Sequence, residues 1–326
     1  MGSMGEDVVG EEFLVRKITE IYEHVSKLPS LKPSEDVNTL FTELVTTCIP
    51  PSSIDVAKLS KENQSMRSNL IKLCGTAEGF LERHYANLLS TFDHPLQHLD
   101  IFPYYSNYLK LSLLEHTILA NHAPKVASAA TRVAFIGSGP LPLTSIVLAL
   151  HHMKSSVFHN YDVDPVANSM ASRLTLTHQD LSQRMLFRTT DIMDVTTDLH
   201  DYDVVFLAAL VGMDIADKLQ VLNHLANHMA PGAMLMLRSA AGARAFLYPV
   251  VDPSDLQDSF EVLSVFHPTD EVINSVVIAR KHSSPLQKNQ HQQQSVENQM
   301  VLPCKRCSKI EAAGFNHGCI VEEQAS

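Results

Sequence analysis

The sequence predicts an α/β fold in which an all-helical N-terminal segment precedes a doubly wound parallel sheet. Two observations support this prediction. Up to about residue 125 the apolar residues recur at helical spacing, whereas from about residue 130 short apolar runs alternate with helical patterns. The second observation is the stretch 133–150, in which a short apolar run is followed by Gly137, Gly139 and a helical pattern. This order is typical of a strand, a glycine turn and a helix.

The helical segment begins with three amphipathic patterns, at residues 12–28, 34–48 and 56–90. Ser34 precedes two carboxylates and is expected to cap the second helix. In the third, Gly75, Gly79, Glu82 and Ala86 are spaced four, three and four, so they share one face. Two interpretations of Glu82 stay open: a solvated surface charge beside closely packed helices, or an acid or base in a cleft wall.

A fourth helix is expected after Pro103, because Tyr104, Tyr108, Leu111 and Glu115 lie at helical spacing. The phenol groups of this face can line a site, or they can pack their rings at a domain boundary and hydrogen-bond their hydroxyls. Residues 121–130 then lead to the central strand.

The second half contains six further apolar runs, which we expect to be strands at 157–162, 185–188, 202–209, 234–238, 260–266 and 273–279. Ligands of open α/β sheets bind beyond the carboxyl ends of the strands. The residues at those ends are 137–140, Asp162, Asp191, 208–210 and Arg238. We expect Asp162 to bind ribose hydroxyls and Asp191 to reach an adenine, whereas Asp164 before a proline suits a helix cap.

The glycine turn is expected to offer unpaired backbone N–H groups and the positive end of a helix dipole to a nucleoside-type ligand. Its two prolines, Pro140 and Pro142, would stiffen the turn without breaking the helix. Pro142 occupies the third glycine position of the dinucleotide-binding pattern, which disfavours a nicotinamide cofactor.

Composition excludes several classes of function. A net charge of -11 in 326 residues disfavours nucleic-acid binding, and 45% apolar residues suffice for a large core. No apolar run is long enough to span a bilayer, and no signal peptide is recognisable, so we expect a cytoplasmic protein. Five scattered cysteines do not form a disulfide framework. We expect domains at 1–125 and 126–281, and a disordered tail at 282–326.

The tail contains Cys304, Cys307, His317 and Cys319, which resemble part of a zinc site. One C-x-x-C pair with irregular partners in a Gln-rich segment is weak evidence, so we expect no metal site.

From about residue 130 to 281 the chain resembles the class I, Rossmann-like fold that binds S-adenosylmethionine. Five stretches resemble plant nicotianamine synthase more specifically: FIGSGPLPLTS at 135–145, SLKPSED at 30–36, IFPYY at 101–105, FLAALVGM at 206–213 and RAFLYP at 244–249. The resemblance implies a transferase that condenses three S-adenosylmethionine molecules. Aminocarboxypropyl groups are transferred to α-amines, one azetidine ring closes, and methylthioadenosine is released. The product chelates iron, zinc, copper and nickel, whereas the synthesis requires no metal and no cofactor beyond its substrate.

The same resemblance implies roles for individual residues. Glu82 becomes the general base and Tyr108 its partner, with Glu78 as the rival for the base. The S-adenosylmethionine site would contain Gly137, Ser138, Gly139, Pro140, Asp162, Asp191 and Ala208. Apart from the resemblance, the fork geometry of the guanidinium group leads us to expect that Arg238 and Arg244 bind substrate carboxylates, and we expect Tyr105 to bind substrate as well.

Two alternative functions remain open at this point: an S-adenosylmethionine-dependent methyltransferase, and a non-catalytic protein that binds metal through its cysteine tail. The sequence also leaves open whether the chain forms a homodimer or associates peripherally with vesicles.

Overall fold

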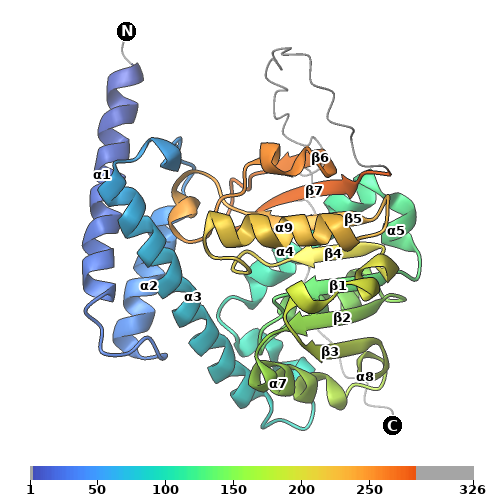
Figure 1. The fold of residues 1–326 in the computed structure, drawn as a ribbon. Coiled ribbons are helices and arrows are strands. Elements are labelled where there is room, and N and C mark those ends of the chain that lie inside the picture. The colour runs from blue at the N-terminus through green and yellow to red at the C-terminus, as the bar shows by residue number, and fades with distance from the viewer. Residues whose placement is uncertain (1–2, 284–326) are drawn as a thin grey trace, which may run out of the picture. The chain divides into compact units, whose positions relative to one another are not determined.

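The structure, a computed structural model, describes residues 3–283, and these belong to one compact unit. Four long helices come first along the chain: α1 (Ser3–Val25), α2 (Glu35–Cys48), α3 (Lys61–Leu89) and α4 (Tyr105–His122) (Figure 1). Ser34 caps α2 by accepting a hydrogen bond from the Val37 N–H at 3.3 Å, as predicted. The first helix begins earlier than its apolar pattern indicated.

A seven-stranded sheet follows, in the order β3-β2-β1-β4-β5-β7-β6. Its strands are β1 (Arg132–Ile136), β2 (Val157–Asp162), β3 (Met185–Thr189), β4 (Val204–Leu207), β5 (Met234–Ser239), β6 (Phe260–Phe266) and β7 (Ser275–Lys281). The first five are parallel, and β7 runs antiparallel to both of its neighbours. The predicted alternation of strands and helices and the closing strand pair are confirmed.

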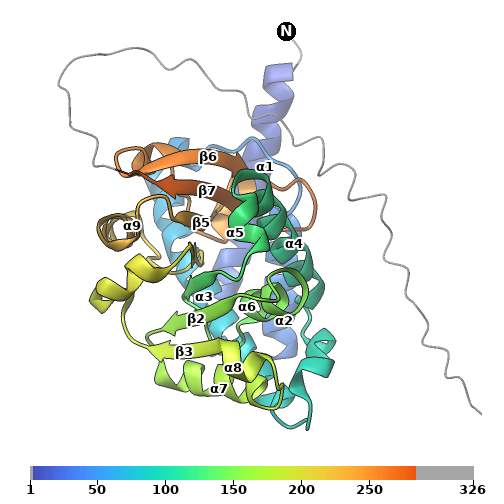
Figure 2. The same ribbon diagram turned by 90° about the vertical axis from the view of Figure 1, so that its right-hand side faces the viewer.

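Helices cover both faces of the sheet, and Figure 2 shows α9 on one side and α4, α5 and α6 on the other. The remaining helices are α5 (Pro124–Ser128), α6 (Leu143–Val147), α7 (Pro165–Leu176), α8 (Leu181–Arg184) and α9 (Ile215–His228). From β1 the sheet continues through β2 and β3 on one side and through β4 and β5 on the other, so the strand order changes direction between β1 and β4. A crevice is expected at the carboxyl ends of these two strands.

The N-terminal helices share an apolar core with a later segment of the chain. Ile18, Leu44 and Leu70 pack in one buried cluster with Phe246 and Ile273. Phe246 ends a 3₁₀ turn, Gly242–Phe246, that follows β5. The division into domains at residue 125 therefore stays a prediction, although the helical and sheet segments are distinct along the chain.

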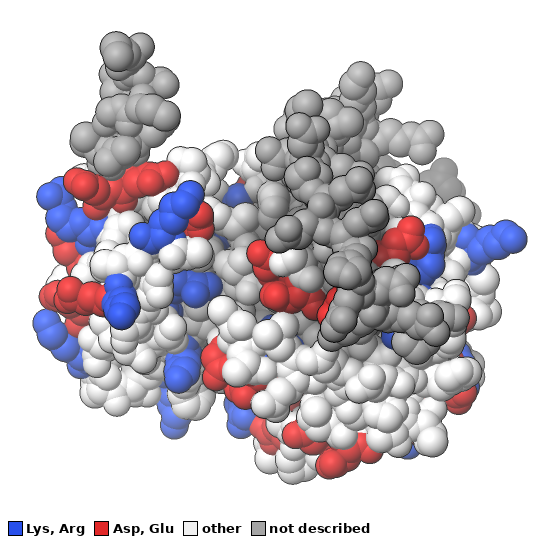
Figure 3. Space-filling model, turned by 45° about the horizontal axis from the view of Figure 1, so that its top comes forward, with Lys and Arg blue, Asp and Glu red and all other residues white. Residues whose placement is uncertain are grey.

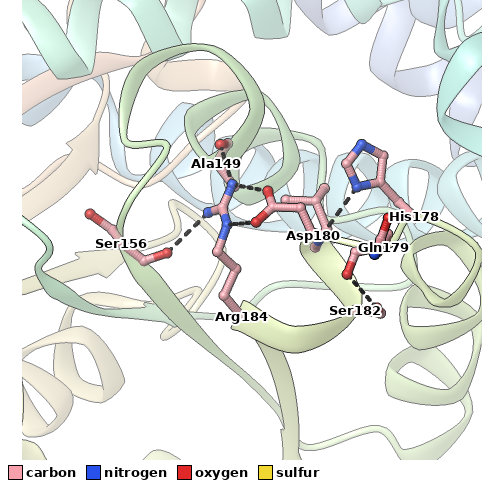
Figure 4. Close-up of polar contacts among 8 residues, drawn as sticks. Ala149, Ser156, His178, Gln179, Asp180, Ser182 and Arg184 are labelled. Carbon is pink, nitrogen blue, oxygen red and sulfur yellow. Dashed lines mark hydrogen bonds and ion pairs between the residues drawn. The ribbon is translucent and has the colours of Figure 1, made fainter.

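Arg184 forms hydrogen bonds that connect the segment before the edge strand β3 to the π-helical turn before β2. Arg184, at the end of α8, donates to the carbonyls of Ala149 at 2.8 Å and Ser156 at 3.0 Å (Figure 4). Asp180 accepts from the same guanidinium at 2.6 and 2.8 Å. Ala149 lies in a π-helical turn, Leu148–His152, whose carbonyl groups thereby gain a cationic donor.

Charged side chains of both signs are interspersed on the face shown in Figure 3. Among residues 3–283, no helix is long and apolar enough to cross a membrane. Within the same range, Cys48 and Cys74 are free thiols, and no group of three or more metal-ligating side chains is placed to hold an ion. From residue 284 on, the predicted tail, with its cysteines, lies outside the described residues.

Candidate active site

A cavity of about 740 Å³ lies at the carboxyl ends of β1 and β4, where the sheet topology predicts it. One wall is α3, which contributes Gly75, Gly79 and Glu82. The opposite wall consists of residues 137–144, the ends of β2 and β3, and the loop 208–214. The predicted row on α3 is thus a cleft wall, and the interpretation of Glu82 as a solvated surface charge is wrong.

The glycine turn is built so that a side chain comes very close to its backbone. Gly139 has φ +66°, and a Cβ there would lie 2.8 Å from the Glu82 Oε2. Gly137 has φ +78°, and a Cβ there would meet the Val211 side chain at 2.3 Å. The positive φ favours glycine at both positions, and at Gly137 the closeness of Val211 and Ala208 leaves no space for a side chain as well.

Three of the backbone N–H groups that we expected to be unpaired are bound within the protein. Gly137 and Ser138 donate their N–H groups to the Tyr161 carbonyl at 2.8 and 3.2 Å. Gly139 donates to the Asp162 Oδ2 at 2.8 Å. The Ser138 hydroxyl, by contrast, is buried and has no hydrogen-bond partner among the described residues. One unpaired donor of the turn is therefore a side chain.

The acidic residues at the strand ends both lie in the cavity wall. Asp162 ends β2, and its second carboxylate oxygen accepts from the Asp164 N–H at 2.9 Å. Asp191 caps a short 3₁₀ turn by accepting from the Met193 N–H at 2.9 Å. Each carboxylate is held by backbone donors and still has lone pairs for hydroxyl or amino groups of a ligand. Asp164 caps α7, as predicted.

A buried lysine holds the loop that follows β4. Lys218, on α9, donates to the carbonyls of Ala208 at 3.3 Å and Ala209 at 2.9 Å. Burial lowers the pKa of its ammonium group to about 7. Ala208 itself lines the cavity and lies directly beside Gly137.

Glu82 stands in an environment that disfavours its charge. Burial, and then the nearby carboxylates of Glu78 and Asp162, raise its pKa well above the usual range. Hydrogen bonding by Tyr108 and the positive charge of Arg238 act in the opposite direction. A cationic ligand in the cavity would add to this second effect, so the site favours positively charged substrates.

Glu78 lies one helical turn before Glu82 and faces a second cavity as well. This cavity has a volume of about 230 Å³ and is lined mostly by apolar and aromatic side chains of α2, α3 and α4. Glu78, Tyr108, Tyr248 and Asn274 line both cavities. The Tyr248 hydroxyl donates to the Glu78 Oε2 at 3.1 Å. These four side chains therefore form the boundary between the two spaces.

Arg238 ends in the cavity wall but is already engaged by protein. Its Nε and Nη2 donate to the two oxygens of Glu115 at 2.7 and 3.0 Å, and Nη2 donates to the Thr144 hydroxyl at 2.6 Å. Both charged side chains of this ion pair are at most 9% exposed. Only the third nitrogen, Nη1, takes no part in these bonds.

Two residues predicted to bind substrate lie elsewhere. Arg244 donates to the carbonyls of Pro268 and Asp270, and it lines neither cavity. Tyr105 also lines neither cavity, whereas its neighbour Tyr104 lines the second one. The structure thus gives their predicted roles no support.

No role for Tyr248, Thr144 or Glu115 followed from the sequence. Tyr248 belongs to the RAFLYP stretch that supported the family resemblance, and Glu115 shares the face of Tyr108. Their positions were therefore visible, but their contacts depend on how α3, α4 and β5 pack together.

The chain is similar to proteins of one family over most of its length. The family model described as nicotianamine synthase protein matches residues 6–286. The chain is 62% identical over 272 residues to nicotianamine synthase of Solanum lycopersicum, covering 83% of this chain and 84% of the relative. It is 56% identical over 317 residues to probable nicotianamine synthase 4 of Arabidopsis thaliana, covering 97% and 96% of the two chains.

A solved structure shows the same fold. The crystal structure of MtNAS in complex with MTA and tNA matches with a TM-score of 0.68 at 23% identity, covering 82% of this chain and 97% of that one. The fold is therefore the class I S-adenosylmethionine-dependent, Rossmann-like type with an additional helical segment.

Proposed function

The chain belongs to the nicotianamine synthase family, and on that premise we propose how its cavity carries out aminocarboxypropyl transfer. The enzyme condenses three S-adenosylmethionine molecules into nicotianamine and releases three methylthioadenosines. The observation that carries the proposal is the position of the Glu82 carboxylate directly over Gly139, in one cavity with Asp162.

The donor is held by the sheet side of the cavity. Asp162 accepts from the ribose hydroxyls, and Asp191 at the end of the next strand reaches the adenine. Gly137, Gly139, Pro140 and Ala208 line the cavity on this side, and the two glycines let the side chains of Val211 and Glu82 come close to the turn. The unpartnered Ser138 hydroxyl supplies one further donor.

The helical side determines which bond breaks. A sulfonium activates three carbon atoms, and the reacting one is the carbon that faces the nucleophile. The acceptor's α-amine loses a proton to Glu82, and its nitrogen attacks the aminocarboxypropyl carbon. The C–S bond breaks, and its electron pair leaves with methylthioadenosine. Tyr108 orients the amine beside Glu82.

The positive charge of the sulfonium has a second effect. It lies near a carboxylate whose pKa is raised by burial, so donor binding lowers that pKa and restores the basic form. Donor binding thus favours the ionised form of the base. Arg238 contributes its free Nη1 to a substrate carboxylate, since its other nitrogens are bound to Glu115 and Thr144.

We propose further that no metal or cofactor besides the substrate takes part, and that the protein works in the cytoplasm. The product's amines and carboxylates then supply metal chelation and transport outside this site.

Incubation with S-adenosylmethionine alone tests the proposal. We expect methylthioadenosine and nicotianamine in a ratio of three to one, with no second substrate added. A methyltransferase without an acceptor would stay idle. Accumulation of adenosylhomocysteine would contradict the proposed reaction.

A further inference from the structure

Glu78 and Glu82 form a pair of carboxylates on adjacent turns of α3, and only one of them is needed as a base. Both line the large cavity, but Glu78 lines the second cavity as well. Residues four apart on a helix are neighbours in space. The pair therefore connects the large cavity, in which the donor binds, to the second cavity.

Two phenols complete this connection. Tyr108, on α4, lines both cavities and contributes hydrogen bonding that lowers the pKa of each carboxylate. Tyr248 donates to the Glu78 Oε2 at 3.1 Å. Neither phenol ionises at neutral pH, because burial and the nearby carboxylates raise their pKa values. Each can still pass a proton through its neutral hydroxyl.

The proposed reaction, on which this inference rests, produces protons repeatedly. In each transfer an ammonium group loses one proton, one N–C bond forms, one C–S bond breaks, and methylthioadenosine leaves neutral. Three donors therefore leave three protons behind. A single carboxylate that takes up the first proton cannot act again until it has released it.

We propose that Glu78 is a relay residue that removes the proton from Glu82 after each transfer. Glu78 receives the proton through the Tyr108 hydroxyl and releases it on the side of the second cavity. Glu78 acts through Glu82 and does not itself meet the reacting atoms. Burial raises the pKa of Glu78, which favours uptake of the proton, and the hydrogen bond from Tyr248 acts in the opposite direction and favours its release.

Different charges surround the two carboxylates. Glu82 also faces Asp162 from β2, whereas Glu78 faces the thiol of Cys74 on α3 and the phenol of Tyr104. Arg238 from β5 lowers the pKa of both carboxylates. The charge of Glu78 raises the pKa of Glu82, so a proton on Glu78 removes that effect and helps Glu82 return to its ionised form.

The test compares Glu78→Gln with the control Glu62→Gln, which changes an exposed glutamate in the first turn of the same helix. Two quantities are measured: methylthioadenosine released per nicotianamine formed, and the pH dependence of kcat/KM. In Glu78→Gln we expect the first transfer to occur as before. The later transfers should slow by about 10-fold or more, but by less than the ~100-fold that is typical when the base itself is lost. The ratio then rises above three, because unfinished intermediates accumulate.

The acid limb of the pH profile supplies a readout that a merely structural role would not move. Without the Glu78 charge the pKa of Glu82 falls, so the limb shifts to lower pH. Glu78→Asp, which keeps the carboxylate, restores a ratio of three. A ratio of three in Glu78→Gln with an unmoved acid limb overturns the relay.

Two further variants keep the outcome interpretable. If Glu78→Gln does not fold, Tyr248→Phe tests the same relay, because loss of its hydrogen bond raises the pKa of Glu78 and again raises the ratio above three. An unchanged ratio in Tyr248→Phe then overturns the relay. Undiminished methylthioadenosine formation in Glu82→Gln would instead refute the proposed base, whatever Glu78 does.

Discussion

Replacement of Glu115 by alanine is expected to destabilise the protein strongly, because it leaves the Arg238 guanidinium buried without its partner. The ion pair joins α4 to β5 through two hydrogen bonds of 2.7 and 3.0 Å, and Glu115 is 1% exposed. Removal of one partner from a buried pair typically costs about 3–5 kcal/mol.

The lower end of that range applies here. Glu78 and Glu82 lie within electrostatic range of Arg238 and stabilise part of its charge. We therefore expect a loss of about 3 kcal/mol, which corresponds to about 6 °C in Tm at ~2 °C per kcal/mol for a chain of this size.

Lys110→Ala is the matched control. Lys110 also lies on α4 and pairs with Glu271, but these side chains are 49% and 53% exposed. Exposed pairs contribute less than about 1 kcal/mol, so its Tm shift stays below about 2 °C. Thermal unfolding followed by circular dichroism compares the two. Equal shifts in both variants would refute the argument that burial makes the Arg238 pair important.

Three further predictions concern the donor site and pH. Gly139→Ala places a methyl group 2.8 Å from the Glu82 Oε2 and strains the backbone, whose φ is +66°, by about 1–2 kcal/mol. We expect nicotianamine formation to fall at least ~10-fold. Undiminished turnover in an activity assay contradicts this. Asp162→Asn weakens methylthioadenosine binding about 10- to 100-fold, the loss expected for one charge-assisted hydrogen bond, and calorimetry showing an unchanged Kd contradicts it. Burial and the nearby His116 lower the pKa of His152 to about 4. Between about pH 6.5 and pH 4 the unfolded chain therefore binds a proton at this residue that the folded chain does not bind. The free energy of unfolding consequently falls as the pH drops through this range. Urea titrations check this, since His152→Gln flattens that fall.

The fold was predictable because each strand and helix carries its own local signal. The glycine turn and the apolar runs that became β4 and β5 all indicated a doubly wound sheet. Asp162 and Asp191 could be placed because the ends of parallel strands meet at one edge.

The contacts between distant segments were not predictable. The N–H groups of the glycine turn are bound because Tyr161 and Asp162 of the neighbouring strand lie within reach, and no local pattern encodes that register. Arg238 and Arg244 lie six residues apart in the sequence, and no local pattern distinguishes their roles. The first ends a strand at the cavity, whereas the second lies in the following 3₁₀ turn and binds carbonyl groups.

The rate of methylthioadenosine formation by Glu82→Gln, at saturating S-adenosylmethionine, tests most directly whether this carboxylate is the base. Glutamine keeps the shape of the side chain over Gly139 but cannot take up a proton. We predict that S-adenosylmethionine still binds while the rate falls at least ~100-fold, with Glu62→Gln unaffected. A rate close to that of the unaltered enzyme would contradict the assignment.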